Sequence, residues 1–234
     1  AEGFYDQGRL LAALAILRQA THKYTFNNSL WAIYARLLIK RGKEKDAKKI
    51  LTRFPHIGNT FDEDFKKASL DIWTAYNLAA AYALLDQREL AFSYLSPVLF
   101  SASDIRGFRT RFELINERND FKNLHNDSRY IFLFDLAKAE SVDDAVQILK
   151  NKLKEMKSIL KSLKKDSRTK TLALQSFRQV KQVIYHLYIV SPPLIEFQRE
   201  FDSYIDEIIE EISVKEIVNL DKLQKRNIQL RQKL

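Results

Sequence analysis

The chain contains no cysteine, so disulfide bonds, thiolate nucleophiles and cysteine-based zinc sites are excluded. Only five glycines and four prolines occur among its 234 residues, which leaves few positions for turns. No segment approaches the roughly 18 apolar residues that a membrane-spanning helix needs. The alternation of apolar and polar residues that is typical of β-strands is nearly absent. We therefore predict an all-α fold dominated by long helices.

What the chain does contain is a motif that recurs near its start. A turn residue is followed five positions later by alanine, and leucine follows four positions after that. The three copies are Gly8, Ala13 and Leu17; Gly42, Ala47 and Leu51; and Asp86, Ala91 and Leu95. The first two copies are 34 residues apart, and the third follows after 44. An apolar stripe precedes each of the last two turns, from Trp31 to Leu38 and from Leu78 to Tyr82, with the spacing of a helix.

This spacing resembles the tetratricopeptide (TPR) family, whose 34-residue repeats are pairs of antiparallel helices. The resemblance covers about the first 130 residues. It implies a stack of helix pairs with a concave surface that holds other chains. It also implies that residues 118–130 form a closing tail, in which Phe121 and Leu124 plug the open end of the array. We therefore predict a TPR-like module over residues 1–130.

The array departs from the family pattern in two places. The ten residues that separate the third copy from its expected position lie in an insert at 54–70, where Pro55 and Gly58 interrupt the helix. The first copy has no complete first helix before Gly8, and the chain does not begin with methionine. From this we expect that a signal peptide, an anchor helix or further repeats precede Ala1 in the intact protein.

Residues 131–234 follow a different pattern and predict an antiparallel helical bundle or coiled-coil hairpin. Apolar residues alternate at intervals of four and three over 142–163, and a second seam runs through 173–187. A third apolar stripe covers 197–212. The positive segment 150–181 and the negative segment 196–221 are expected to lie against each other within the bundle. Alternatively, the two seams pair between chains and form an oligomer.

The resemblance implies that the first helix of each pair lines a partner-binding groove. Mapped onto this chain, the groove residues are Arg36, Ile39, Lys40, Trp73, Tyr76, Asn77, Ala80 and Leu84. Aromatic walls, a floor of small residues and two cations suit a helix or an extended segment that carries a carboxylate. The family's clamp for chaperone tails is not expected, because Ala32 and Arg36 stand where the clamp has lysine and asparagine. The alternative is that the insert at 54–70 packs on Trp73 and Tyr76 and closes the groove.

Residues for catalysis or for metal and cofactor binding are not evident. The four histidines are scattered, and the carboxylates of Asp62, Glu63 and Asp64 lack the glycine and the spacing of a calcium loop. Glycine-rich phosphate loops and nucleophile elbows are absent. We therefore predict a non-catalytic protein without cofactor or metal.

The formal net charge of +9 leaves a second interpretation open. A basic cluster occupies 36–53 and consists of Arg36, Lys40, Arg41, Lys43, Lys45, Lys48, Lys49 and Arg53. This cluster is a candidate surface for nucleic acid or anionic lipid. Few aromatic residues are interleaved with it, which argues against single-stranded nucleic acid.

The leading hypothesis is a scaffold that binds one protein partner through the groove. The chain has a truncated first repeat, no cysteine and a basic surface. In these features it resembles membrane-associated TPR proteins of bacterial envelopes, including those of spirochaetes. The resemblance favours the cell envelope over the cytoplasm, with membrane attachment through a segment before Ala1.

Overall fold

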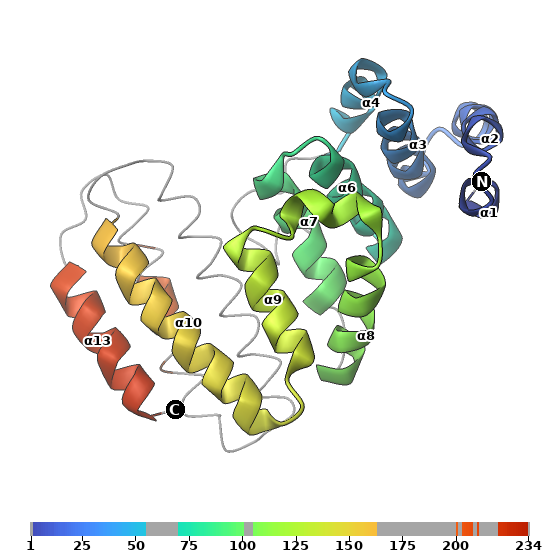
Figure 1. The fold of residues 1–234 in the computed structure, drawn as a ribbon. Helices are drawn as coiled ribbons and strands as arrows, with labels where there is room; N and C mark the ends of the chain where they lie inside the picture. The colour runs from blue at the N-terminus through green and yellow to red at the C-terminus, as the bar shows by residue number, and fades with distance from the viewer. Residues whose placement is uncertain are drawn as a thin grey trace. The chain divides into compact units, whose positions relative to one another are not determined.

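The computed structural model describes residues 2–54, 70–100, 105–162, 200, 203–207, 210 and 220–233. Over these residues the chain consists of helices joined by turns and contains no strand, which confirms the predicted all-α fold (Figure 1). The chain divides into two compact units. We call them the N-terminal unit, residues 1–99 and 115–125, and the C-terminal unit, residues 100–114 and 126–234.

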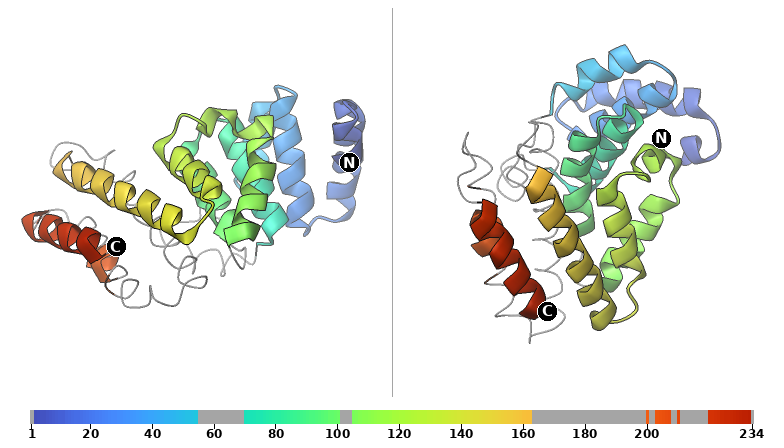
Figure 2. Two further views of the ribbon diagram at one scale, coloured as in Figure 1. Left: turned by 60° about the horizontal axis from the view of Figure 1, so that its bottom comes forward. Right: turned by 60° about the vertical axis from the view of Figure 1, so that its left-hand side comes forward.

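The N-terminal unit is built from short antiparallel helix pairs. Its elements are α1 (Glu2–Asp6), α2 (Leu10–Lys23), α3 (Asn28–Lys40), α4 (Glu44–Leu51), α6 (Ile72–Leu84), α7 (Arg88–Phe100) and the 3₁₀ helix η1 (Asn119–Leu124). Helix α3 is central, because it packs against α2, α4 and α6 (Figures 1 and 2). Helix α6 in turn packs against η1.

The three turns that begin the sequence motif have the same geometry. Gly8, Gly42 and Asp86 have φ angles of 74°, 78° and 54°, in the left-handed region. The N–H of each donates to the carbonyl three residues earlier, over 2.8, 2.8 and 3.0 Å. The N–H of each following residue donates to the carbonyl five residues before it, over 2.8, 2.9 and 2.9 Å. This is the Schellman arrangement, which ends one helix and reverses the chain into the next.

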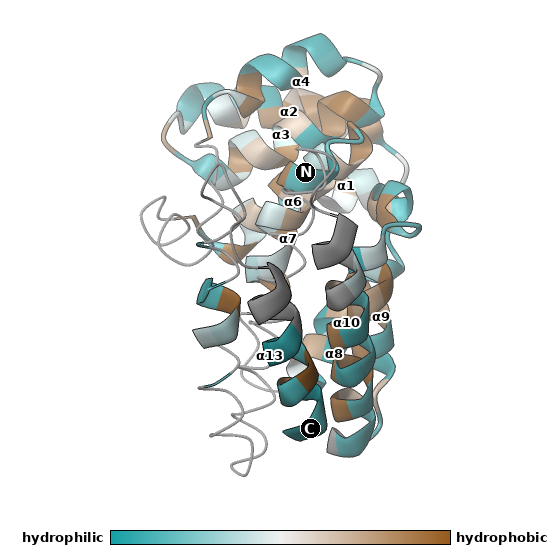
Figure 3. Ribbon diagram, turned by 90° about the vertical axis from the view of Figure 1, so that its left-hand side faces the viewer, coloured by the Kyte–Doolittle hydropathy of each residue, from teal (hydrophilic) through white to brown (hydrophobic). Residues whose placement is uncertain are grey.

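The alanine and leucine of each motif copy are buried. All three alanines, Ala13, Ala47 and Ala91, have no exposed surface, and the leucines that follow them are also in the core. A methyl side chain lets the second helix of a pair approach the first closely, and the leucine one turn later fills the seam. The opposite face of α4 is charged, which colours this helix mostly teal in Figure 3.

Helices α3 and α6 run parallel and are tied together at their N-terminal ends. The Asp71 side chain caps α6 by accepting from the Thr74 N–H over 2.9 Å. The Thr74 hydroxyl lies 3.0 Å from the hydroxyl of Ser29 in the first turn of α3. Asn27 caps α3 in the same way, by accepting from the Leu30 N–H over 3.0 Å. Asparagine and aspartate at these positions satisfy N–H groups that have no partner within the helix.

The C-terminal unit contains the longest described helix, α10 (Val142–Ser162), with 21 residues. Its described elements are α8 (Ile105–Asn116, of which the last two residues belong to the N-terminal unit), α9 (Ser128–Lys138), α10 and α13 (Leu220–Lys233). Helix α10 packs against α9 and α13, and α10 and α13 lie side by side in Figures 1 and 2. Leu149, Leu153 and Met156 of the predicted seam are buried. Ser141 and Asp144 cap α10 reciprocally, over 3.0 and 3.1 Å between backbone N–H groups and side chains.

Three other predicted features of the chain lie wholly or mostly outside the described residues. These are the second seam at 173–187, most of the third stripe and almost all of the insert at 54–70. Where the negative segment is described, Glu200 and Glu207 form ion pairs with Lys233 and Arg226. The pairing expected between 150–181 and 196–221 is therefore an open prediction.

Candidate functional site

The eight predicted groove residues come from two neighbouring helices. Helix α3 supplies Arg36, Ile39 and Lys40, and helix α6 supplies Trp73, Tyr76, Asn77, Ala80 and Leu84. Their exposure differs sharply. The buried members are Arg36, Ile39, Asn77 and Ala80, while Lys40, Tyr76 and Leu84 are half-buried. Only Trp73 among the eight is well exposed, at 69%.

The Arg36 side chain is fully engaged by its neighbours. Its Nε donates to Asp120 Oδ2 over 2.8 Å, and its Nη2 donates to the same oxygen. Its Nη1 donates to Asn77 Oδ1 over 2.9 Å. Arg36 is 4% exposed and Asp120 is 2% exposed, so this ion pair is buried. A buried guanidinium and a buried carboxylate each require such partners to offset the loss of hydration.

A second cation faces the same carboxylate. The Lys40 ammonium forms an ion pair with Asp120 Oδ1 and donates a hydrogen bond to the Tyr5 hydroxyl. The Tyr5 ring also faces both cations, at 4.6 Å from Lys40 Nζ and 5.9 Å from the Arg36 guanidinium carbon. The Tyr76 ring lies 5.4 Å from that guanidinium carbon. We call Tyr5, Arg36, Lys40, Tyr76 and Asn77 the carboxylate cradle, because Arg36 and Lys40 bind Asp120 and the other three contact these two cations.

The residue after Asp120 fills the neighbouring apolar space. Phe121 has no exposed surface, and its ring centroid lies 5.7 Å from that of Tyr76. The side-chain amide of Asn123 donates to the carbonyl of Ala83 in α6 over 3.2 Å. Leu124 is buried as well. The small residues of α6 therefore leave room that η1 occupies, while any contribution of the insert lies outside the described residues.

Trp73 lies at the N-terminal end of α6, beside the cradle. Its ring meets the Tyr76 ring edge-on, with centroids 6.4 Å apart and an interplanar angle of 80°. Trp31, the other tryptophan, is less exposed because Arg53 stacks over it at 4.4 Å and its Nε1 donates to the Thr25 carbonyl over 2.9 Å. Trp73 thus offers the larger free aromatic surface.

Two residues of the cradle region were not among the predicted groove residues. Asp120 appeared in the sequence only as part of the closing tail, and Tyr5 only as the end of a partial helix. The available signal was the pair Arg36 and Lys40, one helical turn apart, because two cations on one inward-facing stripe need a nearby carboxylate. No comparable feature of the sequence indicated that Asp120 would be this carboxylate.

Within the described residues no group of three histidine, aspartate or glutamate side chains is arranged to hold a metal ion. His125, at the end of η1, has a lowered pKa because of burial and the nearby Lys122 charge. The cradle is therefore suited to binding a carboxylate by charge and hydrogen bonds.

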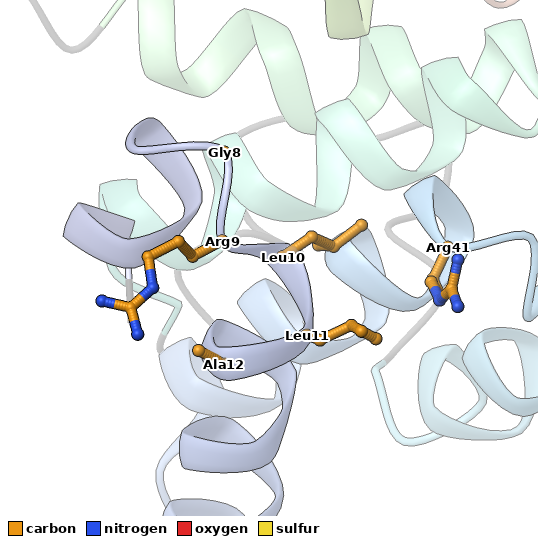
Figure 4. A pocket seen from close by; sticks show the side chains of 6 residues that line it. All are labelled: Gly8, Arg9, Leu10, Leu11, Ala12 and Arg41. Atoms are coloured by element: carbon orange, nitrogen blue, oxygen red, sulfur yellow. The ribbon is translucent and has the colours of Figure 1, made fainter.

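An open hollow lies elsewhere in the N-terminal unit, at the start of α2. It is lined by Gly8, Arg9, Leu10, Leu11, Ala12 and Arg41. Figure 4 shows Leu10 and Leu11 extending toward Arg41, and Arg9 extending away, where its guanidinium lies 4.8 Å from the Phe4 ring. The lining combines the half-buried Leu10 and the exposed Leu11 with two arginines, and it contains no acidic or nucleophilic group.

The basic cluster at 36–53 is divided by the fold. Arg36 and Lys40 turn inward to Asp120, while the other six members are exposed, on α4 and the turns that flank it. Those six are Arg41, Lys43, Lys45, Lys48, Lys49 and Arg53. Glu44 and Asp46 lie among them and reduce the local charge, and Glu44 approaches Lys48 to 3.7 Å.

Comparisons of the chain with protein-family models, curated proteins and solved structures find no match. Among the described residues, no helix has the length and apolarity required to cross a membrane.

Proposed function

We propose that the protein is a non-catalytic scaffold of the TPR type that holds one protein partner on the face formed by α3 and α6. The observation that carries this proposal is the arrangement of helix pairs with three equivalent Schellman turns and two parallel, adjoining first helices. Stacked helix pairs of this kind present their first helices on one shared surface, which suits the binding of another chain.

Trp73 is the residue on that surface best placed to anchor a partner. It is large and well exposed, and its edge-on contact with Tyr76 restrains the ring. Tryptophan is enriched among the residues that dominate binding energy at interfaces, because it buries a large area with little loss of side-chain entropy. Lys40 is half-buried at the edge of the cradle and adds positive charge nearby. We therefore propose an acidic or carboxylate-bearing helix or extended segment as the partner.

The test compares Trp73→Ala with Leu11→Ala, each in the complete chain. Leu11 is a suitable control because it is exposed to a similar degree, 64%, but belongs to α2. Proteins captured from nuclease-treated cell extract and solubilised membranes are identified by mass spectrometry, and helicity is measured by circular dichroism. We expect a partner that is retained by the control and lost by Trp73→Ala. Equal capture by both folded variants would exclude this face as the binding site.

A second candidate function rests on the six exposed cations around α4. We propose as the alternative that they bind an anionic surface, either lipid or nucleic acid. Replacing Lys45, Lys48 and Lys49 by glutamine would then abolish co-sedimentation with vesicles containing phosphatidylglycerol, or weaken retention of duplex DNA. Binding to DNA should fall steeply with salt, with a log–log slope of about −0.9 per neutralised phosphate.

The resemblance to envelope proteins of bacteria also leads us to propose an envelope location. Cell fractionation with antibodies against the chain tests it directly. Recovery with the membrane fraction is the expected result, and recovery only with soluble cytoplasmic proteins would exclude it.

A further inference from the structure

The cradle binds a segment that the chain itself supplies from a distant position. Residues 115–125 belong to the N-terminal unit, whereas the residues on both sides of them, 100–114 and 126–234, belong to the C-terminal unit. Helix η1, only six residues long, lies within the segment 115–125. Its main contacts with the cradle are made by two adjacent side chains, Asp120 and Phe121. Short peptides bind to helical proteins by contacts of the same kind.

The chemistry of these contacts defines what the cradle recognises. One carboxylate receives two hydrogen bonds from the Arg36 guanidinium and faces the Lys40 ammonium. The following aromatic ring packs on Tyr76. Two cations surround one carboxylate, so the cradle keeps an excess of positive charge when Asp120 is bound. Charge-assisted hydrogen bonds of this type are among the strongest that side chains make.

We propose that the carboxylate cradle is a receptor site for a partner segment in which an acidic residue precedes an aromatic one. Asp120 and Phe121 occupy the site in cis and a partner displaces them. This inference rests on the proposed scaffold function and specifies the partner's chemistry. A like-for-like exchange restores the two hydrogen bonds that Arg36 donates to the carboxylate and the ion pair with Lys40, so the buried cations are not left unpaired. The apparent affinity is reduced by the fraction of time that η1 occupies the site.

The contrasting interpretation is that η1 is a permanent part of the core. The two interpretations differ in their response to a competing segment. A permanent plug resists any peptide until the unit unfolds. A displaceable η1 is released by a peptide of its own sequence. It is released more readily when the substitution of Asp120 and Phe121 weakens its contacts with the cradle.

The probe is a synthetic peptide with the sequence of residues 115–125, acetylated and amidated so that its ends carry no charge. Its matched control replaces the aspartate by asparagine. Because the chain has no cysteine, Lys122→Cys gives a single site for a fluorescent label on the exposed side of η1. Release of η1 changes the fluorescence of the label, and titration calorimetry gives the affinity in unlabelled protein.

Three forms of the complete chain are compared. The peptide should bind the Asp120→Asn/Phe121→Ala variant at least tenfold more tightly than the wild type. Adding Arg36→Met to that variant should weaken binding at least tenfold. The asparagine control peptide should bind none of the three forms appreciably. Circular dichroism melts establish that each variant is folded at the temperature of the titration.

Absence of aspartate-dependent binding to the folded variant overturns the inference. If the double variant does not fold, the test uses the labelled wild-type chain. The inference is then overturned when both peptides, at millimolar concentration, give the same fluorescence response. Either result is independent of the Trp73→Ala capture experiment. A partner lost by Trp73→Ala without any peptide displacement would leave the scaffold proposal intact and remove only the cradle as its site.

Discussion

Arg36 and Asp120 are 84 positions apart in the sequence, yet the Arg36 Nε lies 2.8 Å from Asp120 Oδ2 in the interior of the N-terminal unit. This contact fixes η1 against α3 and α6. Asn77 holds the other side of the guanidinium, and Lys40 approaches the second carboxylate oxygen. The most conspicuous cations of the predicted groove are thus already neutralised in part by the chain itself.

Breaking this buried pair should destabilise the N-terminal unit strongly. Asp120→Asn leaves two cations without a counter-charge, and we expect a loss of roughly 3–5 kcal/mol in the free energy of unfolding. Arg36→Met should cost less, because Lys40 still faces Asp120. Urea unfolding of the two single variants and of Arg36→Met/Asp120→Asn completes a double-mutant cycle. A coupling energy near zero would show that the two side chains do not stabilise each other.

Substitution at the left-handed turns should have opposite effects at Gly42 and Asp86. Alanine at Gly42 meets no atom within 4 Å, so its cost comes from the backbone and should be about 1 kcal/mol. Glycine at Asp86 relieves the same strain and should stabilise by roughly 0.5 kcal/mol, since aspartate tolerates this conformation better than most residues. Gly3→Ala, in the first helix and equally free of contacts, is the control and should not destabilise. Chemical denaturation measures all three, and equal effects at Gly3 and Gly42 would contradict the argument.

Asp71 should make the stability of the N-terminal unit dependent on pH in the acid range. Burial tends to raise the pKa of Asp71, but hydrogen bonds from Thr74 and from backbone N–H groups outweigh it and hold the pKa below its ordinary value. The ionised cap therefore stabilises the folded state above the ordinary pKa of aspartate, and its contribution disappears as the pH falls through the lowered one. Asp71→Ala should cost about 1 kcal/mol at pH 7. Asp71→Asn should retain part of the cap and lose less stability between pH 5 and 3 than the wild type does.

Tyr94 should weaken the fold at high pH. Burial raises the pKa of its phenol, the nearby Tyr82 raises it further, and the two rings stack with centroids 5.5 Å apart. Because the folded state keeps the proton, stability is complete below the unfolded pKa of about 10 and falls above it. Thermal melts at pH 8, 9.5 and 10.5 should show a smaller decline for Tyr94→Phe than for the wild type. An identical decline would mean that other groups control the alkaline transition.

The two tryptophans should differ in their access to a neutral quencher. Trp31→Phe leaves only Trp73, which is largely exposed, and Trp73→Phe leaves only Trp31, which lies under Arg53. Acrylamide should quench the fluorescence of the first variant more steeply than that of the second. A neutral quencher is preferable to iodide, because Arg53 would attract an anion to Trp31. Similar quenching constants would indicate that Trp73 is covered in solution, for example by a bound segment.

Local sequence patterns were enough to predict helices and the turns between the first pairs. Gly42 acts through the freedom of its backbone, and Ala47 and Leu51 act through their spacing on one helix face. Both effects are local, so they can be recognised without knowledge of the rest of the fold. These predictions needed only neighbouring residues. The cap of α10 by Ser141 and Asp144 is equally local, because its pattern is complete within four residues.

The residue that the cradle holds, in contrast, depends on long-range packing. Arg36 and Lys40 signalled a need for negative charge, but many carboxylates in the chain could have met it, and packing selected Asp120. It likewise exposed Trp73 while burying Asn77 one turn later on the same helix. Contacts between residues far apart in sequence depend on how whole helices pack, and this information is distributed over the core instead of being written beside either partner.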